Sequence, residues 1–388
     1  MGATEIRTLP DNFWSRNYHC CFPERDFLIK IVRLTLSRFP ANLKESFFHR
    51  HGELMLTLRS LLRIATPPYI FQPLQVVKRL RLEYLWRSRR EACIALPWGL
   101  PIKIDPQEAV GYDIACQGLY ELGVTETLWR LTEMGDLAID AGANIGYMAS
   151  VLGVRVGPKG RVICFEPNPQ VFESLRENVQ NWAKDGRCGM FDLQQAALGK
   201  ETGKARLHMN DWFLTNRGTS WISDQVEDGQ DLRVIEVPLR NLDRVVDEGG
   251  TIGVLKIDVQ GQELNVLQGT AAFLKRHAVR DIVFEEETPY PAPTHEYLKS
   301  LGYAVFGIAE TFSGVQLVPN GQAPYNPEIG PIPNYLATAN PKRAIQRLKP
   351  AMWRSFGPGR LLAGRKDKLI VRATGESFSD VKRDNQTT

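Results

Sequence analysis

The chain has 388 residues, 43% of them hydrophobic and 24% charged, so it can bury the core of a globular protein of one or two domains. A formal net charge of +4 is too small at this length to indicate nucleic-acid binding by itself. No run of about 18 uncharged apolar residues is present, and the polar first 22 residues lack the apolar centre of a signal peptide. The six cysteines form no CxxC pair, which favours a reducing cytoplasm.

The two ends of the chain are basic. Apolar stretches at 27–39 and 55–64 predict helices, and arginines and lysines crowd Leu74–Arg90, so we expect residues 1–91 to form a helical N-terminal extension. Residues 341–388 form a tail that is basic at first and then polar, with its last dozen residues expected to be disordered. Both basic segments fit either solvated surface packed on the rest of the chain or contact with an anionic membrane surface or an anionic acceptor.

From residue 92 to 340 the pattern changes to short β-type runs alternating with helical runs, which indicates βαβ units. We expect strands at 137–140, 161–165, 191–196, 252–257, 281–284, 303–308 and 334–339, and helices at 145–156, 169–182, 262–275 and 294–301. A polar stretch with β-like ends, 204–239, interrupts the alternation. The predicted fold class is therefore α/β, a doubly wound and mostly parallel sheet.

The sharpest motif is Asp140-x-Gly142-x-Asn144-x-Gly146, placed where a buried strand turns into a helix. Small residues there let a ligand approach the backbone, and the helix N-terminus offers free N–H groups. The spacing differs from the G-x-G-x-x-G of dinucleotide sites, which favours S-adenosyl-L-methionine over NAD as the cofactor. A purely structural tight turn is the alternative.

A second motif strengthens the first. Glu166 follows the strand expected at 161–165 and lies 20 residues after Gly146. A carboxylate at this place can accept both ribose hydroxyls of a nucleoside. Pro167 ends the strand, and Pro169 is suited to the first turn of the next helix. Asp140, Gly142, Asn144, Gly146 and Glu166 are therefore predicted to bind the cofactor.

The runs GDLAIDAGANIGY, RVICFEPNP, LQQAALG, VPLRNLD and LKIDVQGQELNVLQG, spread over about Gly118 to Pro341, resemble the FkbM-type methyltransferases in order and spacing. The resemblance implies a class I methyltransferase (Rossmann-like) domain that uses S-adenosyl-L-methionine and methylates a hydroxyl of a sugar, glycan, glycolipid or natural product. The sequence departs from the family in one place, because Gln260 stands where the family commonly has a glutamate. A missing carboxylate there bears on the acceptor or on metal dependence.

Two acids are placed to take part in the chemistry. Asp258 and Glu285 each follow a buried strand, and sites in open sheets lie beyond the carboxyl ends of the strands. Either carboxylate could orient an acceptor hydroxyl, act as a base or hold a divalent ion, although no residue pattern supports a metal. We predict both as catalytic residues, with Asp258 also next to the cofactor. The competing interpretations are a helix N-cap for Asp258 and a solvated strand end for Glu285.

Two further residues are candidates. Family members carry an acid upstream of the first strand, and we assign Glu126 to the cofactor site, with a first-turn helix position as the alternative. His208 is the one histidine considered as a base. The loop Thr215–Trp221 is compatible with a lid over the acceptor or with a plain hairpin.

Other function classes are less consistent with the residues. A dehydrogenase would need G-x-G-x-x-G, which is absent. A nucleic-acid methyltransferase would need a [DN]-P-P-[YF] element or a Pro-Cys nucleophile, and neither occurs. A non-catalytic S-adenosyl-L-methionine-binding protein remains open because of Gln260. We therefore predict an S-adenosyl-L-methionine-dependent O-methyltransferase with a small-molecule or glycan acceptor and no nucleic-acid partner, cytoplasmic or peripheral to the inner membrane surface. The sequence does not indicate the oligomeric state.

Overall fold

The central sheet of the structure, a computed structural model, confirms the predicted fold class. The structure describes residues 91–209, 220–222, 233–288, 290–319, 333–349 and 352–356. Within these residues the main sheet has eight strands in the order β13-β12-β14-β11-β10-β3-β4-β5. The helices predicted in the first 90 residues, the basic segment Leu74–Arg90 and the end of the basic tail lie outside the described residues.

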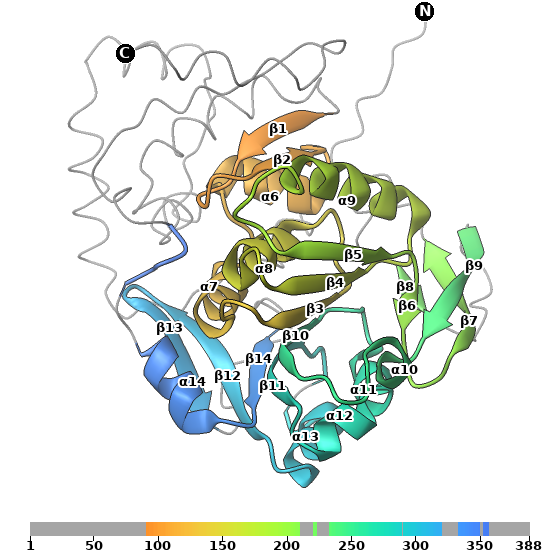
Figure 1. Ribbon diagram of the computed structural model, residues 1–388, viewed down its shortest axis with the longest axis vertical. Helices are drawn as coiled ribbons and strands as arrows, with labels where there is room; N and C mark the ends of the chain where they lie inside the picture. Colours follow the sequence, from red (N-terminus) through yellow and green to blue (C-terminus); the bar gives the residue numbers. More distant parts are fainter. Residues whose placement is uncertain are drawn as a thin grey trace, which may run out of the picture.

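Five neighbouring strands of this sheet are parallel (Figure 1). They are β3 (Leu137–Ala141), β4 (Arg161–Phe165), β5 (Met190–Gln194), β10 (Ile252–Ile257) and β11 (Val279–Glu285). The antiparallel strands β12 (Ala304–Thr311), β13 (Gly314–Pro319) and β14 (Asn334–Thr338) complete the sheet beyond β11. The parallel strands are buried on both faces, as expected for a sheet covered by helices.

Helices cover both faces of the sheet, as Figure 1 shows. One face carries α7 (Leu122–Leu131), α8 (Tyr147–Val156), α9 (Pro169–Trp182) and α14 (Pro341–Leu348), and the other carries α10 (Leu242–Val245), α11 (Glu263–Gln268), α12 (Ala271–Lys275) and α13 (Pro293–Ser300). Alternation along each strand divides the core. Ala138 of β3 packs with the first set and Ile139 with the second, because successive side chains point to opposite faces.

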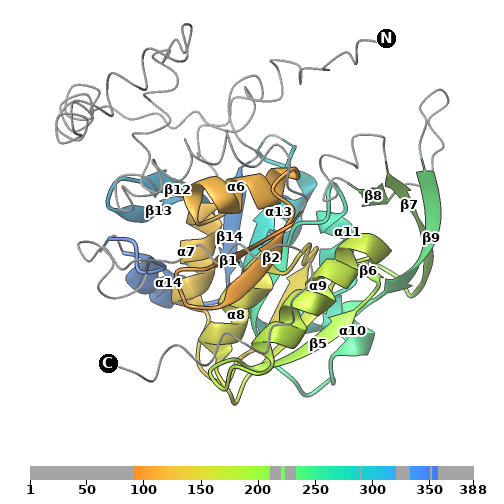
Figure 2. The ribbon, with the colours of Figure 1, turned by 90° about the horizontal axis from the view of Figure 1, so that it is seen from above.

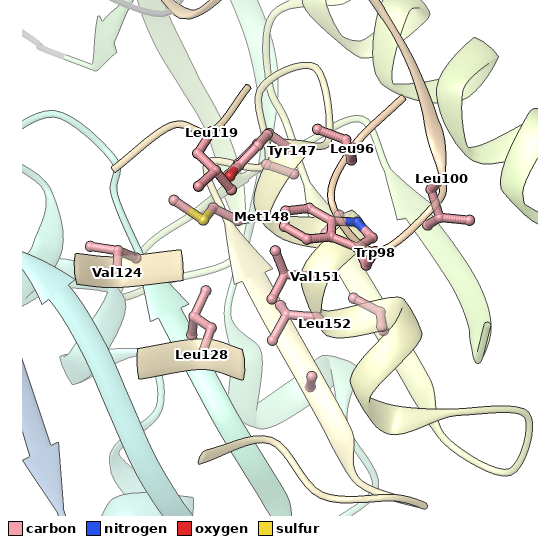
Figure 3. Close-up of a cluster of buried hydrophobic side chains, with 14 of the residues drawn as sticks. Leu96, Trp98, Leu100, Leu119, Val124, Leu128, Tyr147, Met148, Val151 and Leu152 are labelled. Atoms are coloured by element: carbon pink, nitrogen blue, oxygen red, sulfur yellow. The ribbon is translucent and has the colours of Figure 1, made fainter. Parts of the chain in front are cut away.

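The core on the α7 and α8 side is built around Trp98 (Figure 3). Its ring packs edge-on against Tyr147, with 5.5 Å between ring centroids, and its Nε1 donates to Ser150 Oγ at 3.1 Å. Trp98 belongs to the turn of a hairpin formed by β1 (Ala92–Ala95) and β2 (Pro101–Ile104), which is followed by α6 (Ala109–Gln117). This hairpin therefore closes the core over the first turn of α8.

A small second sheet accounts for the polar stretch that interrupts the alternation. Its described strands are β6 (Ala197–Leu198), β7 (Gly203–Met209), β8 (Trp221–Ile222) and β9 (Arg233–Arg240), in the order β6-β9-β7-β8. One face of it is apolar and buried, through Leu207 and Val237. Figure 2 shows this sheet beside the carboxyl end of β5 and separate from the main sheet.

One predicted element needs correction. The single helix expected at 262–275 is two short helices, α11 and α12, because the chain at Gly269 presses against the backbone of Gly199. A Cβ at Gly269 would lie 2.0 Å from the Gly199 carbonyl oxygen. The first part of the basic tail, for which no element was predicted, contains α14, which buries Ala344 and Leu348 against the core. The division into 1–91, 92–340 and 341–388 stays a prediction.

None of the helices in the described ranges is long and apolar enough to cross a membrane.

Candidate functional site

The candidate site lies at the carboxyl ends of β3, β4, β10 and β11. β3 has β4 on one side and β10 on the other, so the chain order of the sheet reverses at this strand. Open α/β sheets bind ligands in the crevice at such a point. The loop from Gly142 to Gly146 leaves β3 here and enters α8.

The glycines of this loop are required by its backbone. Gly142 and Gly146 have φ values of +77° and +96°, in the region that favours glycine. A Cβ at Gly142 would lie 1.8 Å from the carbonyl oxygen of Asp258. At Gly146 it would lie 2.8 Å from a methyl carbon of Leu175 on α9. The glycines therefore let the loop lie directly against the end of β10 and against α9.

Glu166, immediately after β4, is tied to the same loop. Its Oε2 accepts the N–H of Asn144 at 3.0 Å, and its Oε1 accepts the N–H of Asn168 at 2.9 Å. Burial raises the pKa of Glu166 to about 7, against the two N–H bonds that lower it. Each carboxylate oxygen retains acceptor capacity for a further donor. The predicted pairing of the glycine loop with Glu166 is present in the fold.

Lys256 of β10 connects the parts of the site. Its Nζ is buried and donates to the Gly142 carbonyl at 2.9 Å, with Oδ1 of Asp140 at 3.4 Å and Oδ2 of Asp258 at 3.3 Å. Burial lowers the pKa of Lys256, but Asp258 and Asp140 outweigh it, so the pKa lies above its ordinary value. Burial raises the pKa of Asp140, whose carboxylate oxygens have no hydrogen-bond partner among the described residues. Asp140 therefore faces Lys256 inside the fold.

Sequence reasoning missed Lys256, although the sequence contains a signal for it. It is the one charged residue of the buried strand Ile252–Ile257. A charged side chain in a buried strand needs a partner of opposite charge nearby, and the motifs supply Asp140 near the end of one strand and Asp258 directly after Lys256's own strand.

Asp258 and Glu285 lie side by side, as predicted. β10 and β11 are parallel, and Ile257 pairs with Phe284, so the residues that follow them occupy adjacent positions. Burial, then the nearby Asp258 carboxylate, raises the pKa of Glu285 well above its ordinary value. The two carboxyl groups therefore lie close enough to interact electrostatically.

The acid of the segment before β3 that interacts with Asp258 is Glu121, whereas Glu126 lies further along α7. Glu121 begins α7 with a left-handed backbone, φ 41°. Burial, and next the Asp258 carboxylate, raises its pKa to about 8, and Lys256 opposes this shift. Tyr120 beside it has its pKa raised by burial and by Glu121 and Asp258. Glu121 therefore belongs electrostatically to the Asp258 site.

The assignment of Glu126 to the cofactor gains no support from the structure, because both of its carboxylate oxygens are used inside the fold. Glu126 is fully buried, pairs with Nε of Arg130 at 2.5 Å, and accepts the N–H groups of Arg354 and Ser355 at 2.8 Å each. Glu126 therefore fastens residues 352–356 to α7.

Three further residues lie around the Asp258 loop and in the second sheet. Gln260 has a φ of 54°, and its amide donates to Oδ1 of Asp258 at 3.2 Å. Gln262 donates to the Ile222 carbonyl at 3.1 Å, which brings β8 to this loop. His208 is buried in the second sheet, on β7 opposite Trp221. Most of the loop considered as a lid, residues 215–219, lies outside the described residues.

Metal ligation gains no support from the described part of the chain. There, no group of three or more His, Cys, Asp or Glu side chains is arranged to hold a metal ion.

Comparison with known proteins identifies the domain in which this site lies. The family model "Methyltransferase FkbM domain" matches residues 140–305, from the end of β3 into β12. Residues 140–305 form a methyltransferase FkbM domain. The family expected from the motifs is thereby confirmed, and the site described above lies in this FkbM domain, with Glu121 added from the preceding helix.

Two relatives are similar over part of the chain. One is "Hexuronic acid methyltransferase AglP" of Haloferax volcanii, 29% identical over 151 residues, which are 38% of this chain and 56% of that protein. The other is "Methyltransferase 1" of Beauveria bassiana, 25% identical over 146 residues, 34% of this chain and 57% of that protein. This chain thus spans little more than half the length of these relatives.

Among solved structures, methyltransferase FkbM from Methylobacillus flagellatus KT is 17% identical, with a TM-score of 0.33 over 52% of this chain and 43% of that chain.

Proposed function

We propose that this protein transfers a methyl group from S-adenosyl-L-methionine to a hydroxyl group of a sugar or glycan. The observation that carries the proposal is the glycine loop of the FkbM domain held against Glu166, at the point where the strand order reverses. This is where an open α/β sheet receives a nucleoside.

The residues of the site fit this cofactor. Glu166 is oriented by two backbone N–H groups and has acceptor capacity left for two neighbouring hydroxyls, as in a ribose. Asp258, Glu285 and Glu121 place several carboxyl groups around one lysine, Lys256, which favours a positively charged ligand group. When bound, the cofactor supplies a methyl group on a positively charged sulfur.

Asp258 and Glu285 are the groups proposed to handle the acceptor. A hydroxyl is a weak nucleophile at neutral pH, so a carboxylate that orients it and accepts its proton accelerates the transfer. Asp258 is held by Lys256 and Gln260, which fixes its direction. The raised pKa of Glu285 makes it the better proton acceptor of the pair in a poorly solvated site.

The sugar class of the acceptor rests on the relative named a hexuronic acid methyltransferase. A sugar hydroxyl is also compatible with the carboxyl groups of the site, which accept hydrogen bonds from hydroxyls.

The cofactor assignment is tested by isothermal titration with S-adenosyl-L-methionine and with its demethylated product. Glu166→Ala should weaken binding by about 1.5–3 kcal/mol, the range for hydrogen bonds to a charged group. Glu173→Ala, an exposed acid on α9, is the matched control and should leave the affinity unchanged. No heat with either compound would refute the proposal.

The reaction is tested with labelled S-adenosyl-L-methionine and a panel of neutral sugars, hexuronic acids and their glycosides. Asp258→Asn should retain cofactor binding while turnover falls by about 100-fold or more. Cofactor binding without transfer to any hydroxyl compound would favour a non-catalytic binding protein.

A further inference from the structure

A cavity of about 870 Å³ lies where α7, α8 and α14 meet, away from the candidate site. Its lining includes Trp129 near the end of α7, Arg155 near the end of α8 and Arg347 near the end of α14. Figure 2 shows these three helices as neighbours. The candidate site lies at the opposite ends of α7 and α8, about 15 Å away along a helix of ten residues.

The cavity is strongly basic. Six cationic side chains line it against a single carboxylate, Glu133. They are Arg130, Arg155, Arg343, Arg347, Lys349 and Arg354.

Three of these cations are neutralised within the fold. Arg130 pairs with Glu126 at 2.5 Å, Arg343 with Asp281 at 2.8 Å, and Arg347 with Glu133 at 2.5 Å. Some of these paired arginines also donate to helix carbonyls. Arg347, for example, donates to the Arg130 carbonyl at 3.0 Å.

The other three cations have no such compensation. No ion pair among the described residues includes Arg155, Lys349 or Arg354. Arg155 lies over the ring of Trp129, 5.1 Å from its centroid, and donates one bond to the Thr132 carbonyl at 3.2 Å. Its Nε is buried and has no hydrogen-bond partner in the described structure. Burial, and then the positive charge of Arg347, lowers the pKa of Arg155.

The walls of the cavity are fixed before any ligand arrives. Arg130 donates to the carbonyls of Arg347 at 3.3 Å and Lys349 at 2.9 Å, and it also bonds the Met352 carbonyl. These contacts hold the end of α14 and the segment after it against α7. A preorganised cluster of cations binds an anion without the cost of ordering long side chains first.

We propose that this cavity is a binding site for a phosphate monoester or diphosphate group, separate from the methyl-transfer site. A carboxylate carries one negative charge, whereas a phosphate monoester carries close to two at neutral pH and matches the three uncompensated cations better. Arginine guanidinium groups also fit phosphate oxygens in pairs. The cavity leaves room for the molecule that carries the phosphate.

The phosphate could belong to a soluble compound or to a lipid headgroup, and two probes separate these sources. Inorganic pyrophosphate is titrated into the full chain at low salt by calorimetry. Phosphatidylcholine vesicles with and without phosphatidic acid are tested by flotation. The variant Arg155→Gln/Arg354→Gln removes two uncompensated cations, and Arg206→Gln, on the exposed side of β7, is the matched control.

The expected result is pyrophosphate binding that falls about 10-fold or more in the double variant and stays within about twofold in Arg206→Gln. Binding only to vesicles that contain phosphatidic acid, with the same dependence on the two arginines, would assign the phosphate to a lipid. The single variant Lys349→Gln repeats the test if the double variant melts at a lower temperature. The proposal is overturned by absence of binding to both probes, or by equal losses in the pocket variants and in Arg206→Gln.

Discussion

The side-chain amide of Gln260 donates a hydrogen bond to Oδ1 of Asp258, 3.2 Å away. Gln260 stands where the family commonly has a glutamate. A carboxylate can only accept hydrogen bonds, whereas the amide of Gln260 donates one to Asp258. The acid predicted to lie next to the reaction therefore has two stabilising partners, this amide and Lys256.

Gln260→Glu should make the protein less stable at alkaline pH. The new carboxylate would face Asp258 at hydrogen-bond distance, and like charges this close cannot both ionise without cost. We expect about 1–2 kcal/mol of destabilisation at about pH 8.5 and little at about pH 5, where the pair shares a proton. Melting curves at both pH values check this, with Gln262→Glu at the rim as the control. An equal loss at both pH values would contradict it.

Glu121→Gln and Glu126→Gln should have opposite effects, although Glu121 is the N-cap residue of α7 and Glu126 lies only five residues further along. Glu126→Gln weakens bonds to Arg130 and to the N–H groups of residues 354 and 355, so it should lower the melting temperature and leave cofactor affinity intact. Glu121→Gln should reduce affinity for S-adenosyl-L-methionine about 10-fold or more. Calorimetric titration with S-adenosyl-L-methionine and melting curves compare the two variants. If Glu126 were the cofactor ligand, Glu126→Gln would lose affinity and Glu121→Gln would keep it.

Glu121 also predicts a pH dependence of stability. Its pKa is about 8 in the fold and 4.5 ordinarily, so the folded protein holds a proton that the unfolded chain releases between these values. Stability from this group therefore falls as the pH rises from 4.5 to about 8. Glu121→Gln lacks this loss, and its melting temperature relative to the parent should increase over that range. A constant difference would argue against the raised pKa.

The same titration should act on the cofactor. Between about pH 6.5 and 8.5, affinity for S-adenosyl-L-methionine should rise about 10-fold more than affinity for its demethylated product, because only the former carries a positive sulfur. Parallel calorimetric titrations of both compounds measure this. Equal pH slopes would mean that Glu121, Asp258 and Glu285 do not face the sulfur.

Gly142→Ala should be far more damaging than Gly261→Ala. Both glycines have left-handed backbones, with φ of +77° and +86°. At Gly261 no atom lies within 4 Å of an added Cβ, so only the backbone cost of about 1–2 kcal/mol applies. At Gly142 the Cβ would collide with the Asp258 carbonyl at 1.8 Å, which should displace the loop and abolish cofactor binding. Comparable melting and binding in the two variants would show that the loop does not contact β10.

The sequence predicted the parallel sheet well because each buried strand is a short apolar run next to a helical pattern, as at 161–165 and 169–182. It predicted the pairing of the glycine loop with Glu166 because both are local motifs. It selected Glu126 as the acid before β3, since Glu121 and Glu126 are both plausible in sequence and only the packing of residues 352–356 against Glu126 distinguishes them. The single charge in the apolar run 252–257 was a local signal for Lys256, but its partners Asp140 and Asp258 come from contacts between segments. The basic cavity depends on contacts between distant segments, which no local pattern contains.

The position of β14 has a consequence for how the protein is made. It is the last strand of the described sheet in chain order, yet it lies inside the sheet, between β11 and β12. During synthesis, β11 and β12 therefore expose unpaired backbone edges until residues 334–338 leave the ribosome. Open edges of this kind can pair with other chains, so the growing chain is most exposed to aggregation just before its sheet can close.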